Sequence, residues 1–184
     1  EVFDAEAWAK ICKRSQELKL AVSPSVPSEL SLDLRPYQIE GFHFLSYLST
    51  NGFGGILADD MGLGKTVQSI TWLLWLKSNS DEDIPALVVC PKSVLDVWAG
   101  EVKKFASHLR VKILRNKFEL DMDDVRENVD VLVMNYSQLR VNVEHLEKQR
   151  WLAIVLDEGQ QIKNPDSKAA KACLLYTSDA ADEV

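Results

Sequence analysis

Several short apolar segments constrain what this chain can fold into, because their apolar residues are continuous rather than alternating. The strongest are ALVVC at 86–90, DVLVM at 130–134 and LAIVL at 152–156. A strand that is apolar on both sides must be covered on both faces, which is typical of parallel sheets. Two further candidates are GGILA at 54–58 and VKIL at 111–114. The sequence therefore predicts a mostly parallel central sheet.

Helical patterns alternate with these strands. They cover residues 65–76, 94–105 and 137–148. Pro36 is suited to the first position of an earlier helix. That helix would carry an apolar stripe formed by Ile39, Phe42, Leu45 and Leu48. The alternation predicts an α/β fold, in which crossover helices cover both faces of the sheet in a three-layer sandwich.

The chain divides into segments of different composition. Residues 1–20 are predicted to hold a helix, and residues 21–31, with their prolines and serines, indicate a linker. The main body is predicted to span residues 32–172 as one domain. The chain starts with Glu1 rather than Met, which favours its being a piece of a longer protein.

Overall charge and cysteine content narrow the class of protein. The net charge of -7 argues against a stand-alone nucleic-acid binder, although it leaves room for a local basic patch. The three cysteines, Cys12, Cys90 and Cys173, are far apart and odd in number, which indicates a reducing compartment rather than a disulfide framework. No apolar run approaches membrane-spanning length, so no membrane association is expected.

The stretch LADDMGLGKT, at 57–66, reads as a phosphate-binding loop between a strand and a helix. Gly62 and Gly64 allow a tight turn that presents backbone N–H groups to phosphate oxygens, at the positive end of the following helix. Lys65 would reach the β- and γ-phosphates, and the Thr66 hydroxyl would bind Mg²⁺. The usual first glycine is replaced by Asp59. The alternative is a plain glycine turn with an exposed lysine.

An acidic pair follows the apolar run at 152–156. Asp157 and Glu158 would lie beyond the carboxyl end of a strand, where parallel sheets collect ligands. Asp157 is predicted to hold Mg²⁺, and Glu158 to act as general base towards the attacking water. The alternative is a solvated acidic turn.

Together, LRPYQ at 34–38, GLGKT at 62–66, PKSVLDVWAGE at 91–101 and DEGQ at 157–160 resemble the Swi/Snf-related branch of the superfamily 2 helicase-like ATPases. The resemblance covers roughly residues 30–172. It implies the N-terminal, RecA-like ATP-binding lobe of a translocase that uses Mg-ATP to move along duplex DNA. It further implies a second RecA-like lobe and a nucleoprotein target as partners.

The resemblance assigns roles to single residues. Gln38 matches the glutamine that recognises adenine, and Gln160 stands at a catalytic position where eukaryotic members have His. That glutamine favours a bacterial, cytoplasmic protein, whereas a eukaryotic member would be nuclear. The nucleotide-binding set is Arg35, Gln38, Asp60, Met61, Gly62, Leu63, Gly64, Lys65 and Thr66. The DNA-binding candidates are Lys92, Ser93, Asn135 and Tyr136, for which capping or packing roles are equally open.

After Ala172 the family pattern stops. A further strand is expected there, so the fold is predicted to be incomplete at its C-terminus. CLLYTSDAADE, at 173–183, resembles the in-frame translation of a sequencing adapter, and residues 173–184 are therefore predicted to be a non-native tail. The alternative is a natural helix end. Two other readings of the whole chain stay open: an inert truncated fragment, and a different P-loop enzyme such as a small-molecule kinase.

Overall fold

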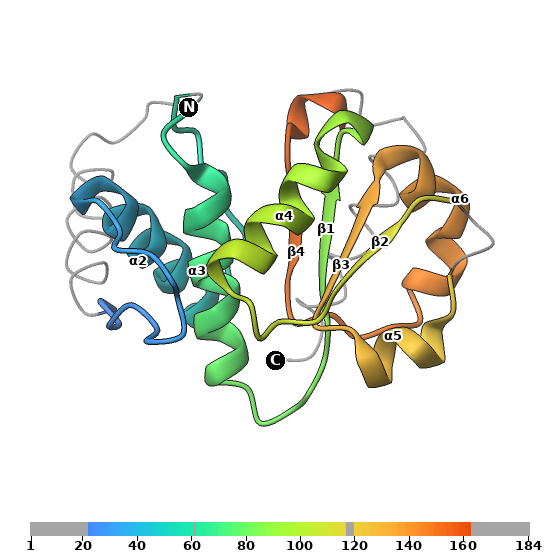
Figure 1. The fold of residues 1–184 in the computed structure, drawn as a ribbon, viewed down its shortest axis with the longest axis horizontal. Helices are drawn as coiled ribbons and strands as arrows, with labels where there is room; N and C mark the ends of the chain where they lie inside the picture. The colour runs from blue at the N-terminus through green and yellow to red at the C-terminus, as the bar shows by residue number, and fades with distance from the viewer. Residues whose placement is uncertain (1–21, 61, 117–119, 163–184) are drawn as a thin grey trace, which may run out of the picture.

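The computed structural model describes residues 22–60, 62–116 and 120–162. Their elements surround a four-stranded sheet with the order β2-β3-β1-β4, in which every pairing is parallel (Figure 1). The strands are β1 (Ala86–Cys90), β2 (Val111–Leu114), β3 (Val131–Asn135) and β4 (Ile154–Leu156). The predicted α/β class and parallel sheet are confirmed.

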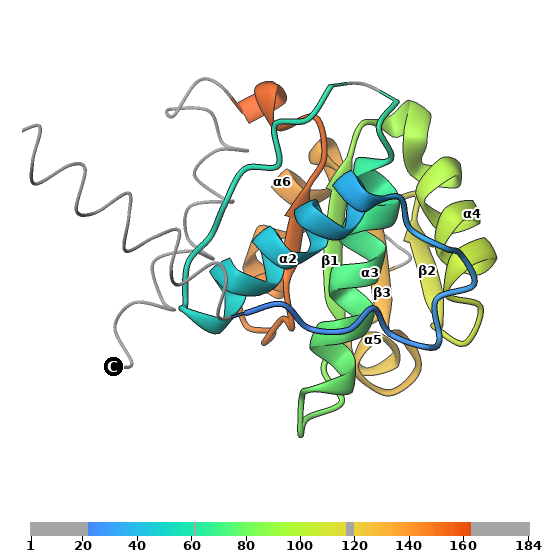
Figure 2. The ribbon, with the colours of Figure 1, turned by 90° about the vertical axis from the view of Figure 1, so that its left-hand side faces the viewer.

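Helices cover both faces of this sheet. The helices are α2 (Pro36–Thr50), α3 (Lys65–Ser78), α4 (Leu95–Phe105), α5 (Met122–Asn128) and α6 (Tyr136–Leu146), with short 3-10 turns η1 (Lys92–Val94) and η3 (Gly159–Ile162). In Figure 2, α2 and α3 lie in front of β1, whereas α6 lies behind it. The result is the predicted three-layer arrangement.

The central strand β1 explains why its sequence is continuously apolar. Ala86, Val88 and Cys90 pack into one core with residues of α3 and α4. Leu87 and Val89 pack into a second core, on the other face, with residues of α5 and α6. All five residues are buried. Each side chain of a fully covered strand enters one core or the other, so no position calls for a polar residue.

The predicted strand at 54–58 is wrong. Residues 53–60 have no regular secondary structure, and Ile56 is 84% exposed. β4 pairs with β1, and its other edge has no partner among the described strands. A strand requires a neighbour for its backbone hydrogen bonds, which this segment does not have. The helix predicted within residues 1–20 and the segments 163–172 and 173–184 lie outside the described residues.

Local side chains determine where the later helices begin. The Asn135 side chain accepts hydrogen bonds from the backbone N–H groups of Ser137 and Gln138, so α6 starts directly after β3. Asp121 caps α5 in the same way. The sequence analysis did not predict α5, whose seven residues are too few for a clear apolar periodicity.

An ionic cluster joins several elements at the amino ends of the strands. The buried Asp130 carboxylate, just before β3, accepts hydrogen bonds from the Arg110 backbone N–H (2.7 Å) and guanidinium (2.9 Å). Lys77, at the end of α3, lies 2.5 Å from Asp130 and also pairs with Asp83. Burial opposes ionisation of Asp130, but the hydrogen bonds from Arg110 and Lys77 outweigh it and hold its pKa well below the usual range.

Replacing Asp130 by Ala should destabilise the fold by about 3 kcal/mol, because two cations would lose a buried partner. Urea denaturation of the purified chain measures this. The control is Asp83→Ala, since Asp83 is 68% exposed and its removal should cost less than about 1 kcal/mol. An equal decrease in the free energy of unfolding in the two variants would contradict the view that Asp130 provides most of the cluster's stabilisation.

The same cluster predicts a pH dependence. The pKa of Asp130 is lower in the folded protein than the ordinary value of about 3.9, so the unfolded chain binds the proton first. The stabilisation is therefore fully present above about pH 5 and is lost progressively as the pH falls towards the folded-state pKa. Asp130→Asn should flatten this loss in denaturation curves measured between about pH 5 and pH 2.5. An unchanged slope would contradict this origin.

Candidate functional site

The glycine loop turns as the sequence predicts. Gly62 has φ 86° and Gly64 has φ 78°, both in the left-handed region that favours glycine. Gly64 is the N-cap of α3, so the loop ends at the positive end of a helix of 14 residues. A Cβ on Gly64 would also lie 2.5 Å from the Gln38 side-chain nitrogen. Glycine is thus needed at 64 for backbone conformation and for close packing.

Lys65 is held by the loop itself. Its Nζ donates to the backbone carbonyls of Asp59 (2.7 Å) and Asp60 (2.9 Å). Thr66, the next residue of α3, is half-buried. The ammonium group is therefore folded over the loop's own backbone, at the helix end where phosphate oxygens would bind. Met61 lies outside the described residues.

Two glutamines support the loop from the helices beside it. Gln38, on α2, accepts a hydrogen bond from the Arg35 backbone N–H (3.0 Å) and donates to the Leu63 carbonyl (3.3 Å). Gln68, on α3, donates to the Asp59 carboxylate (3.3 Å) and more weakly to the Leu63 carbonyl (3.5 Å). Both glutamines are buried. The loop is thus tied to α2 and α3 through side-chain amides.

Gln68 was missed by the sequence analysis. A Cβ on Gly41 would lie 1.7 Å from the Gln68 Oε1 atom, so α2 comes close enough to α3 only because residue 41 is glycine. The available signal was a glutamine among apolar residues on the buried face of α3. The Gln68 Oε1 atom is buried without a hydrogen-bond partner in the described part of the chain.

The acidic pair follows β4 directly. Asp157 Oδ1 accepts a hydrogen bond from the Glu158 N–H (3.0 Å), and Oδ2 accepts one from the Trp98 indole (2.8 Å). The Asp157 carbonyl accepts one from the Tyr136 hydroxyl (2.7 Å). Glu158 has φ 53°, uncommon for a non-glycine residue, and its carboxylate accepts a hydrogen bond from the exposed Gln160 amide. The backbone thus turns sharply at Glu158.

The loop and the acidic pair lie at the same end of the sheet. Figure 1 shows the N-terminus of α3 and the turn η3 beyond β4 at the end where the strands finish. Parallel sheets place ligand-binding residues at this carboxyl end. The predicted Lys65, Thr66, Asp157 and Glu158 therefore share one side of the domain.

The electrostatics around Asp157 favour a cation. Burial, with a contribution from the Asp157 charge, raises the pKa of the Cys90 thiol to about 12. Burial raises the pKa of Glu101 as well, and Asp157 adds to the shift while Lys104 opposes it. Asp157 thus acts as a negative centre felt by two neighbouring groups. Cys90, buried and protonated, is unsuited to nucleophilic chemistry.

The oxygen donors fit Mg²⁺ better than they fit zinc. Thr66 offers a hydroxyl and Asp157 a carboxylate. Each Asp157 carboxylate oxygen accepts one hydrogen bond and retains a further acceptor site. Within the described residues, no group of three or more His, Cys, Asp or Glu could hold a metal. Mg²⁺ needs no such group, because it is usually held by one or two carboxylates together with water and substrate phosphates.

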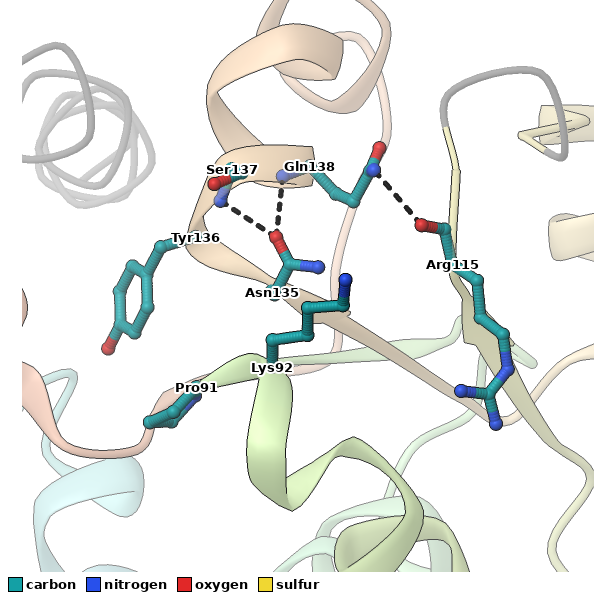
Figure 3. A pocket seen from close by; sticks show the side chains of 7 residues that line it. All are labelled: Pro91, Lys92, Arg115, Asn135, Tyr136, Ser137 and Gln138. Carbon is teal, nitrogen blue, oxygen red and sulfur yellow. Dashed lines mark hydrogen bonds between the residues drawn. The ribbon is translucent and has the colours of Figure 1, made fainter.

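A separate pocket of about 350 Å³ lies beyond the ends of β1, β2 and β3. It is lined by Pro91, Lys92, Arg115, Asn135, Tyr136, Ser137 and Gln138 (Figure 3). Arg115 and Tyr136 stand at opposite sides, with Lys92 and Asn135 between them. Three of the four DNA-binding candidates line this pocket, whereas Ser93 does not.

Arg115 is a pocket residue that the sequence analysis did not single out. Its guanidinium pairs with Asp96 (2.5 Å), and its carbonyl accepts a hydrogen bond from the Gln138 amide (3.2 Å). The Asn135 side-chain oxygen is engaged in capping α6, which confirms the capping alternative for that atom. The exposed Lys92 adds a second positive charge. Polar side chains thus form part of the lining of this pocket, and Lys92 stands there with an arginine that is already paired with Asp96.

The parallel sheet and its covering helices define a RecA-like α/β domain. Residues 37–180 match the SNF2-related domain, and the chain belongs to that family. This match includes part of the segment 173–184, whose origin stays a prediction. It confirms the resemblance drawn from the four motifs.

Individual relatives agree with this assignment. The chain is 40% identical over 154 residues, 82% of its length, to the putative ATP-dependent helicase/translocase YwqA of Bacillus subtilis, of which it spans 16%. It is 34% identical to the ISWI chromatin-remodeling complex ATPase ISW2 of Saccharomyces cerevisiae over 89% of this chain and 15% of that protein. The Sulfolobus solfataricus SWI2/SNF2 ATPase core solved with dsDNA matches with a TM-score of 0.73 and 38% identity, over 83% of this chain and 32% of that one.

Replacing Gly64 by Ala should cost about 1–2 kcal/mol of stability, because alanine is disfavoured at positive φ and its Cβ would crowd Gln38. Gly100→Ala is the matched control. Gly100 lies inside α4, and a Cβ there would meet no atom within 4 Å, so this substitution should stabilise the protein by about 0.5–1 kcal/mol. Thermal melting of both variants provides the measurement. A Gly64→Ala variant as stable as Gly100→Ala would refute the predicted strain.

Proposed function

We propose that this chain is the ATP-binding N-terminal lobe of a DNA-dependent ATPase that couples Mg-ATP hydrolysis to movement along duplex DNA. The observation that carries the proposal is the common placement of the glycine loop and the Asp157–Glu158 pair at the carboxyl end of the sheet, in a chain of the SNF2-related family. The chain spans 16% of the Bacillus protein and 15% of the yeast ISW2 protein, so it corresponds to a small part of each.

The chain's own residues would divide the work as follows. The Lys65 ammonium exchanges the Asp59 and Asp60 carbonyls for β- and γ-phosphate oxygens. Thr66 and Asp157 would hold Mg²⁺, which would supply charge neutralisation at the phosphates. Glu158 orients the attacking water and accepts its proton.

Gln160 and Gln38 would support this chemistry. Gln160 holds the Glu158 carboxylate through its side-chain amide, which cannot titrate as a histidine would. Gln38 recognises adenine with the amide that now bridges the Arg35 N–H and the Leu63 carbonyl, so adenine binding and loop position are linked. Arg35 is exposed beside it, at the start of α2.

The polar pocket around Lys92 is the proposed contact for the DNA backbone. Lys92 and Arg115 provide positive charge, and the exposed Ser137 and half-buried Gln138 provide polar groups that can contact phosphate. In support, the related Sulfolobus core was solved with dsDNA. We place Ser93, exposed in η1, at the edge of the same contact.

The remaining partners follow from the family. We propose a second RecA-like lobe that closes over the nucleotide, and a nucleoprotein target recognised by other parts of the protein. A cytoplasmic location in a bacterium is supported by the glutamine at 160, by the similar Bacillus protein and by the free, buried Cys90. Within the described ranges, no helix is long and apolar enough to cross a membrane.

The isolated 184-residue chain should bind Mg-ATP weakly and hydrolyse it barely above background. An arginine supplied in trans is worth about 10³ to 10⁵ in rate, or roughly 4 to 7 kcal/mol, and we propose that it comes from the second lobe. Phosphate release by the purified chain, with and without duplex DNA, measures this. Lys65→Ala should abolish the weak binding, because it removes the cation that contacts the phosphates.

The outcomes separate the alternatives. Robust turnover stimulated by DNA and abolished by Glu158→Gln would show that one lobe suffices and that the two-lobe mechanism is wrong. Phosphate transfer to a small molecule in a substrate screen would favour a different P-loop enzyme. Nucleotide binding that is unchanged in Lys65→Ala would refute the proposed site.

A further inference from the structure

Two aromatic side chains converge on Asp157 from opposite faces of the sheet. Trp98, on α4, belongs to the core that contains Val88 and Cys90. Tyr136, at the start of α6, belongs to the core on the other face. Trp98 donates to the Asp157 carboxylate at 2.8 Å, and Tyr136 donates to the Asp157 carbonyl at 2.7 Å. Asp157 is therefore held by donors that sit in both hydrophobic cores.

We propose that Trp98 and Tyr136 are positioning residues that hold the Asp157 carboxylate in the orientation needed to bind the nucleotide's Mg²⁺. The inference rests on the proposed function, which makes Asp157 the metal-holding acid. Neither side chain would touch nucleotide or metal. Each acts through Asp157, as the residues behind a metal ligand commonly do.

Hydrogen bonds to both oxygens fix the orientation of the Asp157 carboxylate. Oδ1 accepts from the Glu158 N–H, and Oδ2 accepts from the Trp98 indole, so both oxygens are fixed by protein donors. An ionised carboxylate has roughly four acceptor sites, which leaves capacity for a cation or for water bound to it. The indole N–H can only donate, so the Asp157 oxygen is the acceptor of this hydrogen bond.

Core packing makes this arrangement rigid. Trp98 is 2% exposed and Tyr136 is 9% exposed, so neither ring can swing away without opening a core. The ring of Trp98 packs in the core, while the N–H group at its edge donates a hydrogen bond to Asp157. A buried tryptophan usually needs a partner for its N–H group, and here that partner is the functional acid.

The experiment compares two tryptophan-to-phenylalanine variants of the 184-residue chain. Trp98→Phe keeps an aromatic ring but removes the donor to Asp157. Trp72→Phe is the matched control, because the Trp72 indole also donates to a side chain, the Ser49 hydroxyl at 2.7 Å, between α3 and α2. Binding of a fluorescent, non-hydrolysable ATP analogue is measured by anisotropy at millimolar protein and nucleotide, once with Mg²⁺ and once with EDTA.

The expected result is a loss confined to the Mg²⁺ condition. Trp98→Phe should weaken binding about tenfold with Mg²⁺ and leave binding in EDTA unchanged, as expected for a residue behind a metal ligand. Trp72→Phe should leave both affinities unchanged, because its hydrogen bond does not reach Asp157. Tyr136→Phe should weaken only the Mg²⁺-dependent binding as well, since it retains the ring and removes the hydroxyl donor.

Other outcomes overturn the inference. Equal behaviour of Trp98→Phe and Trp72→Phe with Mg²⁺ would refute it, and so would an equal loss by Trp98→Phe with and without Mg²⁺, which indicates a structural role. Should Trp98→Phe fail to fold, Tyr136→Phe decides by the same two criteria. Lys65→Ala distinguishes failure of the proposed function from failure of this inference. If Lys65→Ala binds nucleotide as the unchanged chain does, the proposed function fails. If Lys65→Ala loses nucleotide binding while Trp98→Phe binds normally, only the positioning role is refuted.

Discussion

The structure depends on the parallel pairing of β1 with both β3 and β4. A parallel neighbour can be reached only by a crossover, so each pairing places a helix on a face of the sheet. The same geometry brings the end of every strand to one side of the domain. The acidic pair and the pocket around Lys92 lie at that side as a consequence, and the glycine loop lies there too, at the N-terminus of α3.

The two ends of the sheet differ in what their residues do: one end contributes to stability, and the other holds the residues proposed to bind ligands. The ionic cluster of Asp130, Arg110 and Lys77 joins α3, β2 and β3 where the strands begin. The residues proposed to bind nucleotide and DNA lie where the strands finish. Substitutions can therefore alter stability at one end without touching the chemistry at the other, which makes the two readily separable by experiment.

The candidate site is supported by buried polar contacts rather than by the loop alone. Gln38 and Gln68 hold the Leu63 carbonyl, and Trp98 and Tyr136 hold Asp157. Tyr136 also lines the polar pocket, so one rigid side chain borders the proposed DNA contact and anchors the proposed metal-holding residue. Hydrogen bonds of this kind strengthen in a buried environment and fix side-chain orientation.

By itself, the sequence determined the features that depend on neighbouring residues. The β-branched runs at 86–90 and 130–134 predicted covered parallel strands, and the glycines at 62 and 64 predicted the turn before α3. Tertiary structure decided what depends on distant partners. The segment at 54–58 had a strand-like sequence but no neighbour to pair with. Only the folded chain brings the Trp98 indole to an acid 59 residues away. A local pattern can show which side chains will be buried, but the partner of a buried polar group depends on which strands and helices become neighbours in space.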